Sequence, residues 1–169
     1  MAPPRPKRAA RTALIQDCAL VLPPRNQCAW LVDAHFVAAA MAAMPVWLGL
    51  GMAVGERMQV VAGWSAWISF VLVLPLVEEL LFRGLLQGQL LRLSSARRMG
   101  PLTLANIWTT MGFVALHLPA QPLPWALAVA VPSLVFGHLR ERFGSVFPAM
   151  LMHALYNTGF ALTAAWVHR

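Results

Sequence analysis

The chain has 169 residues, of which 59% are apolar and only 11% are charged. Soluble domains carry about 25% charged residues, so this composition excludes an ordinary water-soluble domain and predicts an integral membrane protein. The formal net charge of +7 could indicate nucleic-acid binding. However, the basic residues lie between apolar runs of membrane length, so we expect the lipid bilayer as a partner and no nucleic acid.

The first 28 residues are expected to form a basic cytoplasmic arm in front of the membrane domain. Residues 1–12 are rich in proline and arginine, a composition typical of a disordered segment. The apolar stretch Leu14–Pro24 is too short to cross a bilayer and ends at two prolines, so it is a candidate interfacial segment. Residues 29–169 are predicted to form one transmembrane domain.

Five apolar runs follow, and a helix needs about 20 apolar residues to cross the bilayer core. The second run is too long for one straight crossing, so its helix must tilt or extend beyond the bilayer. The fourth is short and contains Pro124 and Pro132, which predict a kinked helix. We predict an all-α, polytopic transmembrane helical bundle with about five spans, with four or six remaining open. The runs are residues 30–54, 58–91, 99–118, 123–139 and 143–167.

The positions of the basic residues predict the orientation of the chain. With five spans, ten of these residues share one side, which the positive-inside rule makes cytoplasmic together with the N-terminus. Near the cytoplasmic ends of their runs stand Asp33, His35 and His138, and we expect solvation at the interface to account for them. The ten basic residues are Arg5, Lys7, Arg8, Arg11, Arg25, Arg92, Arg97, Arg98, Arg140 and Arg142.

Three charged residues, Glu78, Glu79 and Arg83, stand inside the second run, where a charge costs at least about 2.5–3.5 kcal/mol. Glu79 and Arg83 are four residues apart, so on a helix they share a face and can form an ion pair. Glu78 points about 100° away around the helix and has no such partner. The spacing predicts that Arg83 neutralises Glu79 while Glu78 remains available as a general base. A purely structural ion pair with a spare carboxylate is the alternative.

Two further fragments carry polar side chains on other spans. Phe113 and His117 are one helical turn apart in the third run, and His153 and Asn157 share a face of the last run by the same spacing. Each fragment alone also fits side chains that join helices by hydrogen bonds. Together with Glu78 they place a carboxylate, two imidazoles and an amide on three spans, and a bundle can gather such a set around a wet cavity.

The depths of these residues are compatible, although they are not equal. Counting about 1.5 Å per residue from the expected cytoplasmic ends of the helices, Glu78, His117 and His153 lie roughly 21, 26 and 14 Å deep. The value for His117 assumes that the third helix begins near Gly100. Tilt and kinks of the helices could bring the three residues to one depth. The depth of His117 fits least well.

The ordered set Glu-Glu-x-x-x-Arg, Phe-x-x-x-His and His-x-x-x-Asn resembles the three motifs of the CAAX-protease and bacteriocin-processing family, also called the Abi family. The stretch from Phe136-Gly137 through Arg142 to Pro148 is similar to the sequence that precedes the family's last motif. The resemblance covers about residues 70–160. Each motif is weak alone, but three in order at membrane-compatible spacing are specific.

This resemblance implies an intramembrane glutamic endopeptidase that needs no cofactor. Glu78 would activate a water molecule, which His117 would help to hold and polarise. His153 and Asn157 would form the oxyanion hole, where one donor can contribute about 2.7–4 kcal/mol. The peptide bond would be hydrolysed by water directly, without an acyl-enzyme.

The resemblance also assigns Glu79 and Arg83 the task of orienting the site, and it bears on the substrate. The chain has fewer spans than the prenyl-protein endopeptidase branch, and nothing in it identifies a prenyl-binding groove. Its size is similar to that of short bacterial members, including the myxosortase-like and JDVT-tail groups. We therefore expect a membrane-associated protein with a C-terminal sorting tail as substrate, and the bacterial inner (plasma) membrane as location.

Two other functions remain open at this point. The side chains of Glu78, His117 and His153 could hold zinc with an open fourth position, as in a zinc-dependent membrane protease. No His-Glu-x-x-His motif is present, however. Alternatively, a non-enzymatic immunity or transport protein could keep the same polar cluster for packing or proton movement.

Overall fold

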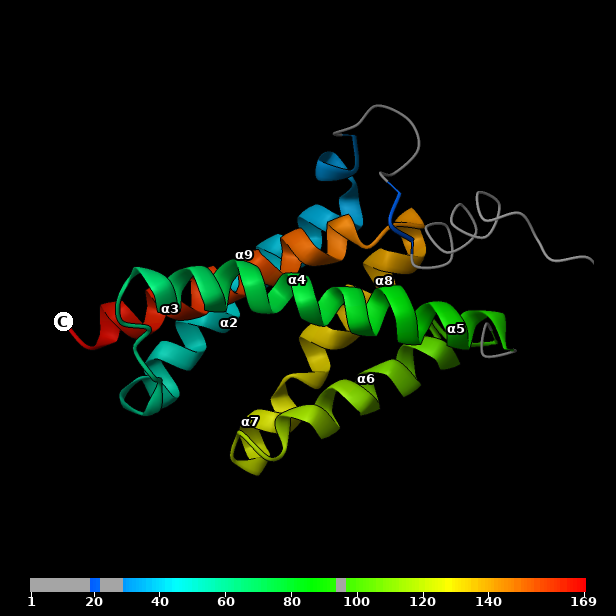
Figure 1. Cartoon of the computed structure of the whole chain (residues 1–169). Coiled ribbons are helices and arrows are strands. Elements are labelled where there is room, and N and C mark those ends of the chain that lie inside the picture. Colours follow the sequence, from blue (N-terminus) through cyan, green and yellow to red (C-terminus); the bar gives the residue numbers. More distant parts are fainter. Residues whose placement is uncertain (1–18, 22–28, 94–96) are drawn as a thin grey trace, which may run out of the picture.

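The computed structural model describes residues 19–21, 29–93 and 97–169, and most of the described chain is helical (Figure 1). The all-α prediction is confirmed. The basic arm expected for residues 1–28 lies outside the described residues apart from Ala19–Val21. In chain order the elements, with η for 3-10 or π segments, are η1 (Ala29–Val32), α2 (Ala34–Val54), η2 (Gly55–Arg57), α3 (Trp64–Ile68), η3 (Ser69–Val73), α4 (Leu74–Glu79), η4 (Leu80–Leu86), α5 (Gln87–Arg92), β1 (Arg98–Met99), β2 (Leu102–Thr103), α6 (Leu104–His117), α7 (Leu123–Ala128), α8 (Ala130–Phe143) and α9 (Phe147–Val167).

The first long helix, α2, packs along the last one, α9. Gly159 of α9 leaves the space that the Trp47 indole occupies, because a Cβ atom at this glycine would overlap the ring. The hydroxyl of Tyr156 donates a hydrogen bond of 3.0 Å to the carbonyl oxygen of Ala39. This contact holds α9, which carries two of the predicted site residues, against α2.

The second helical segment runs without a break from α3 to α5 over 29 residues, Trp64–Arg92. At 1.5 Å per residue it is about 43 Å long, which exceeds the hydrocarbon core of about 30 Å. The prediction of one helix too long for a straight crossing is confirmed. Two of its stretches, η3 and η4, are π-helical, and such wide turns are frequent at functional sites.

The third segment begins later than the sequence indicated. A short antiparallel hairpin pairs Arg98 with Thr103, and the Thr103 hydroxyl caps α6 by accepting a hydrogen bond of 3.0 Å from the Asn106 backbone N–H. The helix therefore starts at Leu104 rather than near Gly100. Counted from this start, His117 lies about 20 Å deep, close to the value for Glu78.

The fourth segment is kinked, as its prolines predict. The chain turns at Val129 between α7 and α8. Pro132 lacks an N–H, so the carbonyl of Ala128 cannot receive the usual hydrogen bond from it. At its end, α8 stops at Gly144, whose φ of 60° lies in the left-handed region that favours glycine.

Two side-chain contacts join the start of α2 to the end of α8. The guanidinium of Arg142 donates hydrogen bonds of 2.8 Å to each oxygen of Asp33, and His35 Nδ1 lies 3.1 Å from His138 Nε2. Asp33 and the two histidines thus have protein partners in addition to any interfacial solvent. The hydrogen bonds from Arg142 lower the pKa of Asp33 from 3.8 to about 2. The pair therefore stabilises the fold at neutral pH and loses this effect as the pH falls through about 2.

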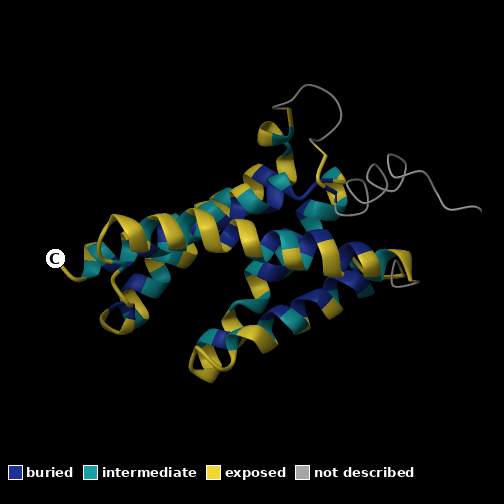
Figure 2. Ribbon diagram, viewed as in Figure 1, coloured by how far each residue is buried: buried dark blue, intermediate teal, exposed yellow. Residues whose placement is uncertain are grey.

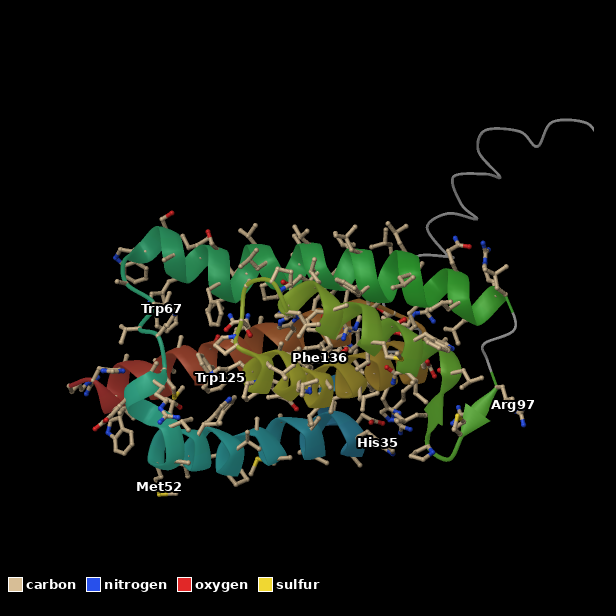
Figure 3. All side chains as sticks on the ribbon, turned by 90° about the horizontal axis from the view of Figure 1, so that it is seen from below. His35, Met52, Trp67, Arg97, Trp125 and Phe136 are labelled. Atoms are coloured by element: carbon tan, nitrogen blue, oxygen red, sulfur yellow. The ribbon has the colours of Figure 1, made fainter. Side chains whose placement is uncertain are left out.

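At the opposite end of the bundle, the C-terminal end of α9 contacts the connection that follows α2. His168 Nε2 lies 3.0 Å from the carbonyl oxygen of Met58, in the connection that follows α2. Arg97 and Trp67 mark the two opposite ends in Figure 3. The helical segments alternate in direction between these ends, as an arrangement of five passes requires.

The bundle has the surface of a membrane protein. Figure 2 shows exposed residues along the outer faces of its helices, and large apolar side chains such as Met41, Leu72 and Leu162 are among the exposed residues. Within the described part of the chain, three segments are long and apolar enough to cross a membrane: Ala34–Arg57, Trp64–Arg92 and Leu123–Phe143. The 14-residue α6 and the 21-residue α9 are the other two helical segments of the bundle.

A pair of glycine substitutions tests the close packing of α6 against α8. A Cβ at Gly137 would overlap the side-chain amide of Asn106, whereas nothing among the described residues lies within 4 Å of a Cβ at Gly49. Because overpacking typically costs about 1–3 kcal/mol, Gly137→Ala is expected to lower the melting temperature of the detergent-purified protein. Gly49→Ala is the control and should leave it unchanged or raise it. Equal melting temperatures for the two variants would contradict this packing.

Candidate active site

The Glu79–Arg83 pair lies at the centre of the bundle. Arg83 Nη1 is 3.1 Å from Glu79 Oε1, four residues before it, and neither side chain is exposed. The predicted ion pair is therefore present in the structure. A charge at this place has no access to bulk water, so each partner depends on the other for compensation.

Arg83 also connects its helix to α6 and α8. Its Nη2 donates hydrogen bonds of 3.0 Å to the carbonyl oxygen and 2.8 Å to the hydroxyl of Ser133. The guanidinium lies over two rings, 4.8 Å from the centroid of Phe113 and 5.3 Å from that of Phe136. Cation–π contacts of this kind are strongest where water is excluded. The arginine is thereby fixed from three directions.

His153 on α9 is held by the same carboxylate. Its Nδ1 lies 2.9 Å from Glu79 Oε1, and because an ionised carboxylate can only accept, Nδ1 donates its hydrogen. The imidazole is stacked on Phe136, with centroids 4.6 Å apart and ring planes 20° apart; Phe136 lies in the middle of the bundle in Figure 3. The other ring nitrogen, Nε2, therefore has a defined direction.

Glu78 is the carboxylate toward which that second nitrogen points. Its Oε2 lies 3.7 Å from His153 Nε2, and 20% of its side chain is exposed. Among the described residues no side chain or backbone group gives Glu78 a hydrogen bond. The predicted difference between the two neighbouring carboxylates is thus present. Glu79 contacts Arg83 and His153, whereas Glu78 accepts no hydrogen bond from the described residues.

His117 lies at the end of α6 beside the same cluster. Its Nδ1 is 2.8 Å from the Phe113 carbonyl oxygen, and its ring centroid is 4.5 Å from that of Phe113. Phe113 in turn contacts His153 at 6.2 Å between centroids. Both imidazoles are close enough to Glu78 to interact with it electrostatically. The later start of α6 explains why His117 reaches this level, which the sequence-based depth left uncertain.

Asn157 has a partner that the sequence did not indicate. Its Nδ2 donates a hydrogen bond of 2.8 Å to the carbonyl oxygen of Phe70. In the π-helical stretch, the Leu74 N–H bonds to Ser69, five residues back, and the next donor in this pattern would be Pro75, which has no N–H. Asn157 fills the place of that missing donor. Its amide and the imidazole of His153 therefore do not converge on one protein acceptor, although a second Nδ2 hydrogen remains on Asn157.

A second layer of polar side chains lies one helical turn closer to the end of the bundle that carries Arg97. None of the three motifs includes it. Gln87 Nε2 donates to the Gly137 carbonyl oxygen at 3.1 Å and to Glu141 Oε1 at 2.7 Å. The Thr103 hydroxyl donates to the same Glu141 oxygen at 2.6 Å. A signal for this layer exists in the sequence: Gln87 continues the four-residue spacing of Glu79 and Arg83.

The zinc alternative concerns the grouping of possible ligand side chains. Over residues 19–21, 29–93 and 97–169, no three His, Cys, Asp or Glu side chains are grouped so that they could hold a metal ion. His153 directs one nitrogen to Glu79, which is itself paired with Arg83. Both side chains are thus engaged in a network of ion pairs and hydrogen bonds.

Comparison with known proteins decides the family. A family model described as type II CAAX prenyl endopeptidase, Rce1-like, matches residues 60–159. The chain belongs to this family. The match includes every predicted site residue and confirms the resemblance inferred from the three motifs. No significant match was found among curated proteins or among solved structures.

Membership of the CAAX endopeptidase family makes this chain a peptidase, and its apolar helices make it an integral membrane protein. It is a CAAX-type intramembrane protease. The buried Glu79–Arg83 pair and the open Glu78 lie within the matched region, on the helix that begins at Trp64. The myxosortase-like subtype stays a prediction.

The buried ion pair gives a stability prediction for this endopeptidase. Arg83→Met should lower the free energy of unfolding by about 3–5 kcal/mol, because it leaves the Glu79 carboxylate buried without its cation. The double variant Glu79→Gln/Arg83→Met removes both charges and should recover part of that loss. Melting temperatures in detergent compare these variants, with Arg57→Met at the exposed end as control. A double variant less stable than Arg83→Met would contradict the pairing.

Proposed function

We propose that this chain hydrolyses a peptide bond of a membrane-associated protein by a water molecule that Glu78 activates. The observation that carries the proposal is the 3.7 Å distance between Glu78 Oε2 and His153 Nε2. It is too long for a direct hydrogen bond, and a water that lies beside the two atoms can contact both of them. Such a water would contact a carboxylate that accepts no hydrogen bond from the part of the chain that the structure describes.

The proposed reaction proceeds by general base catalysis. Glu78 removes a proton from the water, and the water oxygen bonds to the carbonyl carbon of the substrate, whose carbonyl oxygen becomes an oxyanion. When the carbonyl re-forms, the carbon–nitrogen bond breaks and the proton held by Glu78 passes to the leaving nitrogen. The products are a carboxylic acid and an amine, and no covalent enzyme intermediate forms.

We propose that His153 and Asn157 stabilise the oxyanion. His153 Nδ1 donates to Glu79, and Nε2 would be the ring nitrogen that donates to the oxyanion. Asn157 would contribute the amide hydrogen that does not bond to Phe70. His117 would hold the water from the side of α6.

For the substrate, we propose a protein with a C-terminal sorting tail rather than a prenylated one, in the bacterial inner membrane. The similarity of the chain to short bacterial members supports this choice. The name of the family model, which refers to prenyl endopeptidases, supports the alternative. We further propose a cytoplasmic N-terminus, because the basic residues that the structure describes between the second and third segments and at the end of α8 share one end of the bundle.

Glu78→Gln tests the mechanism. The substitution keeps the shape of the side chain but removes the base, so kcat should fall by about 10²–10⁴-fold. Glu56→Gln, at an exposed carboxylate in η2, is the matched control and should retain the parent rate. The full chain in liposomes would be assayed with two quenched fluorescent peptides, one ending in a prenylated CAAX sequence and one with an apolar segment followed by a basic tail. Parent-like cleavage by Glu78→Gln would overturn the mechanism.

We also propose that the reaction needs no metal ion. Dialysis of the purified protein against a chelator should leave its rate unchanged, and metal analysis should find less than one zinc ion per chain. A stoichiometric zinc ion that is lost together with activity, and restored together with it, would favour the zinc mechanism instead.

A further inference from the structure

We propose that the hydroxyl groups of Ser133 and Thr110 are positioning groups for the active site: they hold Arg83 in the orientation in which Glu79 directs His153 toward Glu78. The inference rests on the proposed function and adds two residues that none of the three motifs contains. Both are buried inside the bundle, Ser133 on α8 and Thr110 on α6.

The first step of the argument concerns what orients the guanidinium. Its contact with Glu79 is a 3.1 Å ion pair, but Nη1 and Nε lack a partner with hydrogen-bond geometry among the described residues. The well-formed hydrogen bonds of Arg83 are the two that Nη2 donates to Ser133. Attraction between charges has little directionality, whereas hydrogen bonds depend steeply on angle. Ser133 is therefore the group that sets the plane of the guanidinium.

The second step concerns the hydroxyl of Ser133. Arginine can only donate, so the Ser133 oxygen accepts from Arg83 and its own hydrogen is free to point elsewhere. The Thr110 hydroxyl lies 2.9 Å away and can take that hydrogen. This arrangement turns a lone pair of Ser133 toward Arg83. Within the described part of the chain, Thr110 thus acts on Arg83 through Ser133.

The third step follows the contacts toward the reacting groups. Glu79 Oε1 contacts both Arg83 and His153. A rotation of the guanidinium therefore changes the geometry of the hydrogen bond that this oxygen accepts from the imidazole. His153 Nε2 is the atom that faces Glu78. Small displacements of a positioned group can cost a large factor in rate. The two hydroxyls therefore act on catalysis from a distance, without touching the water or the substrate.

Neighbouring threonines on α6 provide a matched control. Thr109 is as buried as Thr110, but its hydroxyl has no hydrogen-bond partner among the described residues. Replacing either one by valine removes a hydroxyl from the same turn of the same helix. Only Thr110→Val removes a group that contacts Ser133.

The kinetic experiment uses the full chain in liposomes with the two quenched peptides described above. Ser133→Ala should lower kcat about tenfold, as expected for the loss of a hydrogen bond to a charged group, with KM unchanged. Ser133→Thr should restore most of the rate. Thr110→Val should lower kcat by a smaller factor, and Thr109→Val should not lower it. The double variant Ser133→Ala/Thr110→Val should be no slower than Ser133→Ala, because both act through one contact.

A second readout does not depend on a substrate. In protein with isotope-labelled histidine, the NMR shifts of the ring nitrogens report which of them carries a proton, and the His153 signals are assigned by their loss in His153→Gln. Ser133→Ala should move these signals, and Thr109→Val should not. Melting temperatures in detergent show whether each variant is folded.

The outcomes separate the two proposals. Parent-like kcat and parent-like His153 signals in Ser133→Ala would overturn the positioning role, as would equal losses in Thr110→Val and Thr109→Val, or multiplicative losses in the double variant. If Glu78→Gln is inactive while Ser133→Ala matches the parent, only the inference fails. If Glu78→Gln matches the parent, the proposed function fails, and the His153 signals alone decide whether Ser133 holds the imidazole.

Discussion

A buried arginine is the constraint on which this bundle depends. No bulk water reaches the Arg83 guanidinium, so its charge and its donors must be satisfied by protein groups alone. Glu79 supplies the opposite charge, Ser133 the acceptors, and the Phe113 and Phe136 rings the remaining surroundings. These groups come from three helical segments. Satisfying one cation therefore brings together the helices that carry Glu78 and His117, and Glu79 connects this group to His153 on α9.

The same pairing repeats one turn away and fixes the register of the helices. Arg83 bonds to Ser133 and Gln87 bonds to Gly137, and in both cases the partners are 50 residues apart in the chain. A constant offset means that the two helices run in parallel with their turns aligned. Sliding one helix past the other would break both layers at once and leave buried polar groups without partners. Polar contacts therefore fix the geometry of the active site. Apolar packing alone would be weakly specific within a bilayer.

Sequence patterns predicted the all-α membrane fold, the long second helix and the kinked fourth one, since run length and proline positions act locally. They also predicted the Glu79–Arg83 ion pair, because four-residue spacing on a helix depends on no other part of the chain. What they missed depends on contacts between distant segments. The hairpin that delays the start of α6 changed the depth of His117, and Ser133, the partner of Arg83, lies on α8 outside all three motifs. Neither follows from the periodicity of one segment.

Asn157 shows why a motif residue cannot be assigned to chemistry from its spacing alone. Its amide donates to the Phe70 carbonyl, at the place where Pro75 interrupts the backbone hydrogen bonds of a π-helical stretch. One of its two amide hydrogens therefore supports the helix that carries Glu78, and only the other is available to a substrate. A substitution at Asn157 would change helix geometry and oxyanion binding together. Glu78, to which no described group donates a hydrogen bond, is the position at which a loss of rate reports on the chemistry itself.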